Sequence, residues 1–300
     1  MGPTASGKTD VAINLVENMP ADIISVDSVN IYKDMNIGSA KPTTTEQLKA
    51  PHRLIDFLDP AKAYSAADFR DDAVREIENI LQQGRMPILV GGTMLYFRAL
   101  FNGLAKLPSA NATVRAALEA QANAHGWQVM HDRLASIDAT AAKKIHPNDP
   151  QRIQRALEVY ELTGTPMSEL QKQTAVPAPY NFIKYVICPA QRNALHARIE
   201  KRFHAMLEQG FMSEVEALYQ RGDLTLNMPS MRAVGYRQIW ELLAGESDYT
   251  SMIDKGIAAT RQLAKRQLTW LRAEPDCQWF DSEQPDIQAQ VLKSVQTTHI

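Results

Sequence analysis

The stretch that decides the fold is Met1-Gly2-Pro3-Thr4-Ala5-Ser6-Gly7-Lys8-Thr9. Four residues separate Gly2 from Gly7, and Lys8 and Thr9 follow directly, which is the spacing of a phosphate-binding P-loop. Gly7 allows the backbone to turn so that successive N–H groups converge on phosphate oxygens. Lys8 adds a positive charge, and the Thr9 hydroxyl can bind a Mg²⁺ that neutralises the same phosphates. The alternative is an ordinary turn that contains glycine.

The residues after the loop predict a helix and then a buried strand. Val11 and Leu15 are spaced as on one helix face, and such a helix would point its N-terminus at a bound anion. Residues 23–26 are a short apolar run, typical of a buried parallel strand. Asp27 follows this strand, and open α/β sheets bind ligands at that end. We therefore expect Asp27 beside the P-loop; the alternative is an aspartate in a turn or cap.

The loop itself raises a question about the strand before it. A P-loop normally connects a strand to a helix, and in this numbering nothing precedes Met1. We expect the natural chain to begin upstream, with this numbering starting at an internal methionine.

Further strands and helices alternate along the chain and predict the fold class. Ser65 and Asp68 form a capping box for a helix that runs to about Gln83. Residues 86–90 are a second buried strand, followed by a Gly-Gly-Thr loop, whereas residues 29–60 are expected to be irregular. Strands are also expected at 181–188 and 277–280. We predict an α/β fold with a P-loop NTPase-like parallel sheet flanked by helices.

The middle of the chain has only helical patterns. Trp127, Met130 and Leu134 fall on one helix face, which is more typical of a core than of a cofactor site. Asp149 is expected to cap a helix that begins at Pro150 and ends near residues 164–166. We predict a P-loop catalytic core domain at 1–107 and 181–300, and a helical insertion domain at 108–180.

The last third of the chain predicts helices with clustered cations. Arg198 and Arg202 lie one turn apart on a helix of residues 195–210, where they can face one point or be solvated. Ser230 is expected to cap a helix through residues 232–238. A helix over 250–273 carries five cations and no acid beyond residue 254, which suits either a solvated face or contact with a polyanion. These cations are Lys255, Arg261, Lys265, Arg266 and Arg272.

Composition sets outer limits on function. The 300 residues carry a formal net charge of −2, so any nucleic-acid binding must rest on local patches. Cys188 and Cys277 are too few for a disulfide framework or a zinc site of their own. There is no 18-residue apolar run, so we expect a cytoplasmic protein without a membrane partner.

Taken in order, nine motifs make the chain resemble the bacterial tRNA dimethylallyltransferases (tRNA isopentenyltransferases, the IPP transferase family). The P-loop alone would be weak support, whereas the ordered set is specific and covers nearly every residue. The motifs are residues 2–9, 25–28 (Ser-Val-Asp-Ser), 31–33 with 38–42 (Gly-Ser-Ala-Lys-Pro), 51–54, 64–69, 91–93, 146–152 (His-Pro-Asn-Asp-Pro-Gln-Arg), 234–238 and 260–267.

The resemblance implies an activity and its partners. A dimethylallyl group would pass from dimethylallyl diphosphate to N6 of adenosine 37, 3′-adjacent to the anticodon, in tRNAs that read codons beginning with U. Diphosphate would be released, with Mg²⁺ as cofactor at Thr9. The family also implies a monomer with a nucleotide-binding, ATP-binding type of P-loop, a flipped adenine in a channel ending at Asp27, and an insertion domain that grips the anticodon stem-loop.

The resemblance also implies roles for individual residues. Asp27 would be the general base, Arg202 would stabilise the departing diphosphate, and Thr4 would contact it near the bond being broken. The diphosphate-binding loop would be Gly2, Pro3, Thr4, Ala5, Ser6, Gly7, Lys8 and Thr9. The tRNA-binding residues would be Asp27, Ser28, Val29, Asn30, Thr93, Arg115, Gln151, Arg152, Ile153, Gln154, Arg155, Arg232, Ala233, Val234, Gly235, Tyr236 and Arg237.

Two other classes fit parts of this pattern. A small-molecule or nucleotide kinase would use the same loop and aspartate, with Arg198 and Arg202 as lid arginines on ATP. A non-catalytic, NTP-dependent RNA-binding module would not need Asp27 at the ligand edge of the sheet. Transfer of label from the γ-phosphate of ATP, or of carbon label from dimethylallyl diphosphate, separates these classes.

Overall fold

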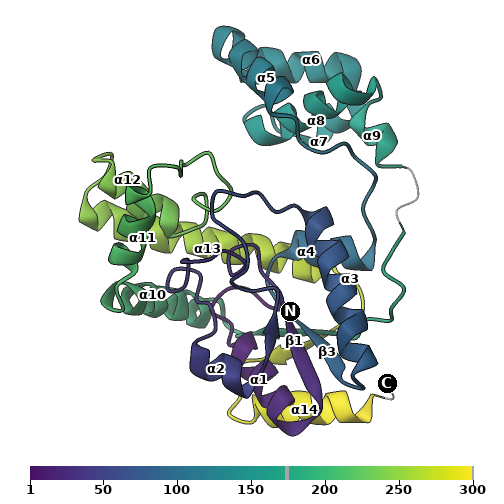
Figure 1. The fold of residues 1–300 in the computed structure, drawn as a ribbon, viewed down its shortest axis with the longest axis vertical. Coiled ribbons are helices and arrows are strands. Elements are labelled where there is room, and N and C mark those ends of the chain that lie inside the picture. Colours follow the sequence, from purple (N-terminus) through teal and green to yellow (C-terminus); the bar gives the residue numbers. More distant parts are fainter. Residues whose placement is uncertain (173–175, 299–300) are drawn as a thin grey trace. The chain divides into compact units, whose positions relative to one another are not determined.

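The structure, a computed structural model, describes residues 1–172 and 176–298 and divides into two compact units. Unit 1 is Met1–Arg98 with Tyr180–Ile300, and unit 2 is Ala99–Pro179, drawn in blue to teal in Figure 1. The insertion therefore begins nine residues before the expected residue 108. The backbone N–H of Ala178 donates to the carbonyl of Leu100 at 2.9 Å, so the outgoing and returning segments are joined within unit 2.

Unit 1 is built on a three-stranded parallel sheet. Its order is β2 (His52–Arg53), β1 (Ala21–Val26), β3 (Met86–Gly91), and β1 is buried along its whole length. Ile23 pairs with both His52 and Ile88 in the ladder. The predicted strands at 23–26 and 86–90 and the parallel α/β class are confirmed.

A second, two-stranded parallel sheet consists of β4 (Lys184–Cys188) and β5 (Cys277–Asp281). The first two residues of the chain bond to both sheets. The N–H of Gly2 donates to Gly91 at the end of β3, at 3.3 Å, and the N–H of Ile187 on β4 donates to the carbonyl of Met1 at 2.9 Å. The P-loop is thereby fixed at the carboxyl ends of β3 and β4.

Helices cover both faces of the β1–β3 sheet because successive side chains of a strand point to opposite sides. Ile23 packs with Ala12 of α1 (Lys8–Asn18), while Ile24 packs with Ile77 and Ile80 of α3 (Ala66–Gln82). The capping box that begins α3 is present as predicted. α14 (Ile287–Thr297), which the sequence analysis did not predict, packs against α1.

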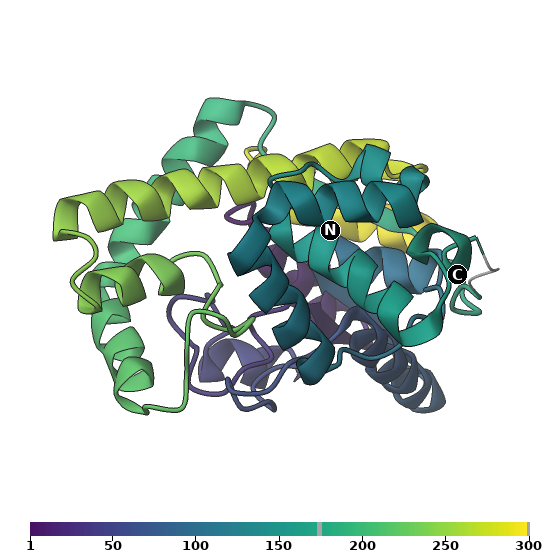
Figure 2. The same ribbon diagram turned by 90° about the horizontal axis from the view of Figure 1, so that it is seen from above.

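A helical layer completes unit 1 and holds its largest core. It comprises α10 (Arg192–Glu208), α11 (Phe211–Gln220), α12 (Tyr236–Leu243) and α13 (Tyr249–Ala273), the long yellow-green helix of Figure 2. Gly256 lets α13 approach α10, because a Cβ there would lie 2.3 Å from the ring of Phe203. Phe203, Phe211 and Tyr236 centre this core.

Two predictions about local structure in unit 1 were wrong. Ser230 does not cap a helix: it is fully buried, its hydroxyl donates to the carbonyl of Pro60 at 2.6 Å, and α12 begins later, at Tyr236. Residues 29–60 are not wholly irregular, since they contain β2 and α2 (Thr44–Lys49). A capping box of Thr43 and Glu46, present in the sequence, begins α2.

α4 (Met94–Phe101) leads from unit 1 into unit 2, whose other helices are α5 (Ala112–His125), α6 (Trp127–Ile137), α7 (Ala139–Lys144), α8 (Pro150–Thr163) and α9 (Met167–Leu170). As predicted, Met130 and Leu134 are core residues and Trp127 packs against that core. The carboxylate of Asp149 caps α8 by accepting the N–H of Arg152. Within the described parts of both units, no helix has the length and apolarity needed to cross a membrane.

Candidate active site

The P-loop adopts the turn that its sequence predicts. Gly7 has a φ of +85°, a value that glycine adopts without strain, and α1 begins at the next residue. The ammonium group of Lys8 donates to the carbonyl of Pro3 at 3.2 Å, so the lysine curls back over the loop. The loop amides and Lys8 therefore form an anion-binding turn at the N-terminus of a helix.

Gln267 of α13 ties the P-loop to a neighbouring loop. Its Oε1 accepts the N–H of Thr4 at 2.9 Å, and its Nε2 donates to the carbonyl of Gly92 at 2.9 Å. Gly92 has no room for a side chain there, because a Cβ would lie 2.4 Å from the Gln267 amide. One glutamine thus sets the distance between Thr4 and the loop after β3.

Asp27 lies at the carboxyl end of β1, as its sequence position predicts. Its Oδ1 accepts the N–H of Val29 at 2.8 Å and of Asn30 at 3.2 Å, which fixes the carboxylate in one orientation. Two neutral donors on one oxygen leave the other oxygen able to accept a proton. The neighbouring Ser28 N–H donates to the hydroxyl of Thr93 at 3.1 Å, which joins the ends of β1 and β3.

The catalytic candidates line one cavity of about 150 Å³ in unit 1. Thr4, Lys8 and Thr9 come from the P-loop region, Asp27 from the end of β1, and Arg202 from α10. A second cavity, of about 910 Å³, shares Lys8, Thr9 and Arg202 with the first and adds Ser6, Gly7 and Arg198. Gly2 and Pro3 are buried and line neither cavity.

Burial lowers the pKa values of two cations in this cavity, Lys8 and Arg202. The pKa of Lys8 is lowered to about 8, mainly by burial, with Asp27 opposing the shift and Arg202 adding to it. Burial also lowers the pKa of Arg202, while Asp27 opposes that change. Lys8 and Arg202 face the same cavity, and Asp27, which acts on both of them, carries one negative charge. Such a site favours an anion with more than one negative charge.

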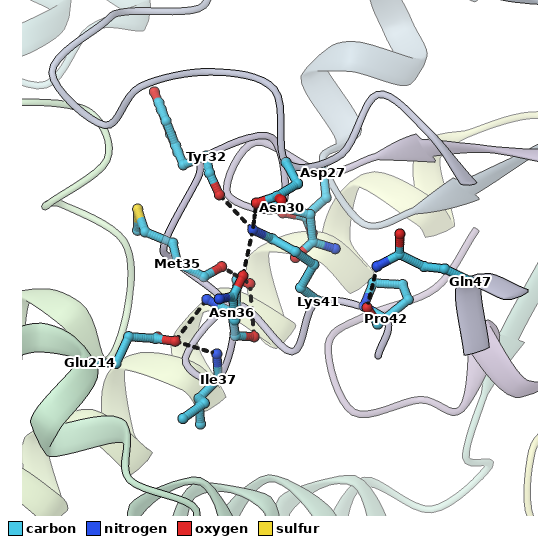
Figure 3. Close-up of polar contacts among 12 residues, drawn as sticks. Asp27, Asn30, Tyr32, Met35, Asn36, Ile37, Lys41, Pro42, Gln47 and Glu214 are labelled. Carbon is cyan, nitrogen blue, oxygen red and sulfur yellow. Dashed lines mark hydrogen bonds and ion pairs between the residues drawn. The ribbon is translucent and has the colours of Figure 1, made fainter. Parts of the chain in front are cut away.

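The loop over residues 35–41 forms part of the wall of both cavities and is held from two sides (Figure 3). The carboxylate of Glu214 on α11 accepts the N–H groups of Asn36, Ile37 and Gly38, at 2.7 to 3.0 Å. It also accepts the hydroxyl of Tyr236 at 2.6 Å. From the other side, the ammonium group of Lys41 donates to the carbonyl of Tyr32, to Asn36 Oδ1 and to Asp56.

The expected RNA-contact residues of unit 1 fall into three environments. Asp27, Val29, Asn30, Ala233, Val234 and Gly235 line the smaller cavity. Arg232 and Arg237 are exposed, Arg237 in an ion pair with Glu241 at 2.8 Å. Tyr236 is fully buried and serves the core instead.

In unit 2 the expected residues also differ in environment. Gln151 and Arg152 are exposed on α8, whereas Ile153 is fully buried in the core and Gln154 donates to the carbonyl of Arg115. Arg115 and Arg155 both bond to the carboxylate of Glu158, which is fully buried. These two arginines therefore neutralise a buried acid, and Arg152 is the more accessible cation.

The site suits a divalent cation only together with a phosphate ligand. Among the described residues, no group of three His, Cys, Asp or Glu side chains could hold a metal ion. Thr9 lines both cavities, and its hydroxyl can give one oxygen ligand. Mg²⁺ keeps about six oxygen ligands and is commonly bound through substrate phosphates, so the residues fit that mode.

Sequence reasoning missed Gln267 and Glu214 as residues of this site. Gln267 closes one of the quoted motifs, and that motif is the signal that could have found it. Glu214 lies in no such motif, and its role follows only from the contact of α11 with residues 36–38.

Comparison with known proteins finds a matching family model and similar solved structures, all described as IPP, isopentenylpyrophosphate or dimethylallyl transferases. Residues 30–274 match the family model described as IPP transferase. The full-length tRNA isopentenylpyrophosphate transferase of Bacillus halodurans is 36% identical, with a TM-score of 0.72 over 98% of this chain and 93% of that one.

Two further solved structures are similar. The tRNA delta(2)-isopentenylpyrophosphate transferase of Staphylococcus epidermidis is 33% identical, with a TM-score of 0.69 over 99% of this chain and 96% of that chain. A eukaryotic dimethylallyltransferase, described as acting on tRNA, is 27% identical, with a TM-score of 0.79 over 98% of this chain and 76% of its own. The parallel sheet flanked by helices is thus a fold shared with tRNA prenyltransferases.

Proposed function

The chain belongs to the IPP transferase family, and from that premise we propose that it is a tRNA prenyltransferase that uses dimethylallyl diphosphate. The observation that carries the proposal is that Asp27, Lys8 and Arg202 line one cavity at the carboxyl end of the sheet. The fixed carboxylate of Asp27 lies in the same cavity as the cations Lys8 and Arg202, which can bind an anion. This arrangement suits a reaction in which a proton is removed while a diphosphate leaves.

The reaction balances with these groups. The exocyclic N6 of an adenosine forms a bond to C1 of the dimethylallyl group as the C1–oxygen bond breaks, and that electron pair leaves with the diphosphate. N6 becomes positively charged in the step and loses its proton to the carboxylate of Asp27. The Asp27 oxygen bound by the Val29 and Asn30 amides orients the group, so its other oxygen takes the proton.

The cationic side of the site stabilises the leaving diphosphate. Lys8, Arg202 and the loop amides supply positive charge where negative charge develops. Thr9 would hold a Mg²⁺ against the same phosphates, and when bound this ion neutralises further charge on the leaving group. Thr4, whose N–H is held by Gln267, would contact the diphosphate near the breaking bond.

The acceptor nucleotide that we propose is adenosine 37, 3′-adjacent to the anticodon, in tRNAs that read codons beginning with U. An adenine in a stacked loop must be flipped to reach Asp27, and Val29, Asn30 and Val234 line the cavity that would receive it. The exposed Gln151 and Arg152 on α8 would contact the anticodon stem-loop, whose backbone and splayed bases are the usual targets of RNA recognition.

A two-label experiment tests the proposed function. Purified protein is incubated with unmodified tRNA, Mg²⁺ and either ¹⁴C-labelled dimethylallyl diphosphate or ATP labelled at its γ-phosphate. We expect carbon label in tRNA, mapped by nuclease digestion to the nucleotide after the anticodon, and no phosphate transfer. Phosphate transfer without carbon transfer would identify a kinase, and a tRNA lacking an adenosine at that position serves as the control substrate.

A further inference from the structure

Unit 1 has a third cavity that belongs to neither part of the site above. It has a volume of about 610 Å³ and lies where the beginning of α10 and the second half of α13 meet the ends of β4 and β5. None of its lining residues lines the two site cavities. α13 presents Leu263 and Gln267 to the active site but Lys265 and Arg272 to this cavity, which we name the cationic groove.

The groove carries an excess of positive charge on a protein of net charge −2. Four arginines or lysines line it: Arg192, Arg261, Lys265 and Arg272. Arg261 is paired with Glu200 at 2.7 Å. For Lys265 and Arg272, both exposed, the described part of the chain contains no ion-pair partner. Cations that are not neutralised within the protein are available to an external anion.

The acid and the histidine of the groove do not cancel this charge. Asp281 is the single acid among the residues that line the groove, and its one negative charge stands against four lining cations; its Oδ1 accepts the N–H groups of Ala190 and Glu283, both at 3.0 Å. The pKa of His196 is lowered by burial and by the nearby Arg192 and Arg261. Gln191 gives the start of α10 no side-chain cap, so the helix N-terminus adds to the positive potential.

The groove also offers a flat aromatic surface beside apolar walls. Trp279 on β5 lines it with 46% of its surface exposed, and Pro189, Leu195 and Leu268 contribute apolar contacts. An exposed indole beside unpaired cations is the combination that binds nucleotides, through stacking of the base and charge pairing of the phosphate. A volume of several hundred cubic ångströms suits one such ligand.

We propose that the cationic groove binds a nucleoside phosphate, with its base stacked on Trp279 and its phosphate held by Lys265 and Arg272. The ligand is either a free nucleotide or one nucleotide of a single-stranded RNA, since both present the same chemistry. This inference does not depend on the proposed transfer reaction, because no residue of the groove lines the smaller cavity that contains Asp27, where the reaction is proposed to take place (the reaction cavity).

The test measures binding of AMP and of a five-nucleotide oligoadenylate by isothermal titration calorimetry. Saturating inorganic diphosphate is present throughout to occupy the P-loop. The groove variants are Trp279→Ala and the double variant Lys265→Ala with Arg272→Ala. The matched control is Lys255→Ala, an exposed cation on α13 that does not line the groove. All four substituted positions are exposed, and thermal melting confirms that each variant is folded.

We expect the groove variants to weaken binding at least tenfold and the control to bind within twofold of the parent protein. Trp279→Phe should restore most of the affinity, because it keeps a stacking surface. AMP binding as tight as that of the oligonucleotide would identify a free nucleotide as the ligand, and much tighter oligonucleotide binding would identify RNA. Unchanged affinities in the groove variants, or no binding by the parent protein, would overturn the proposal.

Discussion

At the scale of single residues, Asp27 has one role that the structure shows and one that we propose, and one substitution can separate them. Its Oδ1 is held by two backbone amides, and its other oxygen is assigned the proton of N6. Asp27→Asn keeps a carbonyl oxygen for the two amides but removes the group that accepts a proton. We expect kcat to fall by about 10² to 10⁴, as for loss of a general base, with donor and tRNA affinity within a few-fold.

Single-turnover transfer to saturating tRNA, with separate binding assays, measures this prediction. Asp254→Asn, at an exposed position of α13, is the control for loss of one negative charge. Transfer at the parent rate would remove Asp27 from the role of base. Loss of tRNA binding would make Asp27 a recognition residue instead.

Lys8 gives a prediction about pH. Its pKa is lowered from 10.5 to about 8, largely by burial, so the free protein loses this charge as the pH rises through 8. The uncharged amine binds a diphosphate less well, and kcat/KM for the donor should fall as much as tenfold per pH unit above about 8. In Lys8→Arg, activity is lower but the fall with pH should disappear, because a guanidinium does not titrate there.

The same shift has the opposite sign for stability. Between pH 8 and 10.5 the unfolded chain binds the proton of Lys8 more readily than the folded chain, so the contribution of this residue to stability rises with pH.

The activity measurement can contradict the shifted pKa of Lys8. A donor kcat/KM that stays constant from pH 7 to 9.5 would show that Lys8 remains charged in the folded protein.

At the scale of elements, α11 acts on the site through one carboxylate. Glu214 holds three successive N–H groups of the loop at residues 36–38, and Gly38 lines the reaction cavity. In Glu214→Ala these amides lose their common acceptor, which should cost about 1–3 kcal/mol of stability. A looser wall should raise the donor KM several-fold and lower kcat less.

Melting curves and steady-state kinetics measure both effects, with Glu216→Ala as the control on the exposed side of the same helix. Hydrogen exchange at residues 36–38 gives a readout that loss of global stability alone would not give. Faster exchange confined to this loop is expected, whereas unchanged exchange and an unchanged donor KM would leave Glu214 with a role only in packing.

Elements whose signals are local could be predicted from the sequence. The P-loop with α1, the apolar runs of β1 and β3, and the capping residues Ser65 and Asp149 each depend on neighbours within a few residues. Ser230 has the same local signal but bonds to Pro60, which lies 170 residues away. Glu214 likewise acquires its role from a distant loop, so its function could not be predicted from local patterns.

The candidate site follows the same division. Asp27 and Lys8 could be placed together because the carboxyl ends of parallel strands meet at one edge of a sheet. Arg202 was assigned through family resemblance, and its place in the cavity results from the packing of α10 on α13. Gln267 was missed because a glutamine on a helix gives no sequence signal of the two backbone groups that it joins.

At the scale of the whole molecule, a protein of net charge −2 must bind a polyanion through particular cations. Their accessibility differs: the side chain of Arg152 is 68% exposed and that of Arg237 is 57% exposed. Arg155 is 29% exposed, and it donates to Glu158 and to the carbonyl of Pro108. The expected RNA-contact arginines therefore divide into exposed cations and cations committed to the fold.

This division predicts opposite outcomes for two neighbours on α8. Arg152→Ala removes an exposed cation, so it should weaken tRNA binding and reduce the log–log salt slope by about one unit or less, with little change in melting temperature.

Arg155→Ala leaves the fully buried carboxylate of Glu158 with one arginine instead of two, which should destabilise unit 2 by about 1–3 kcal/mol. Arg237→Ala in unit 1 should resemble Arg152→Ala, because Arg237 is also an exposed cation. Filter binding across salt concentrations and thermal melting measure both quantities, and affinity for dimethylallyl diphosphate should be unchanged in Arg152→Ala and Arg237→Ala. A parent-like salt slope in both exposed variants would mean that tRNA binds elsewhere, and a stable Arg155→Ala variant with a reduced slope would return Arg155 to the RNA-binding surface.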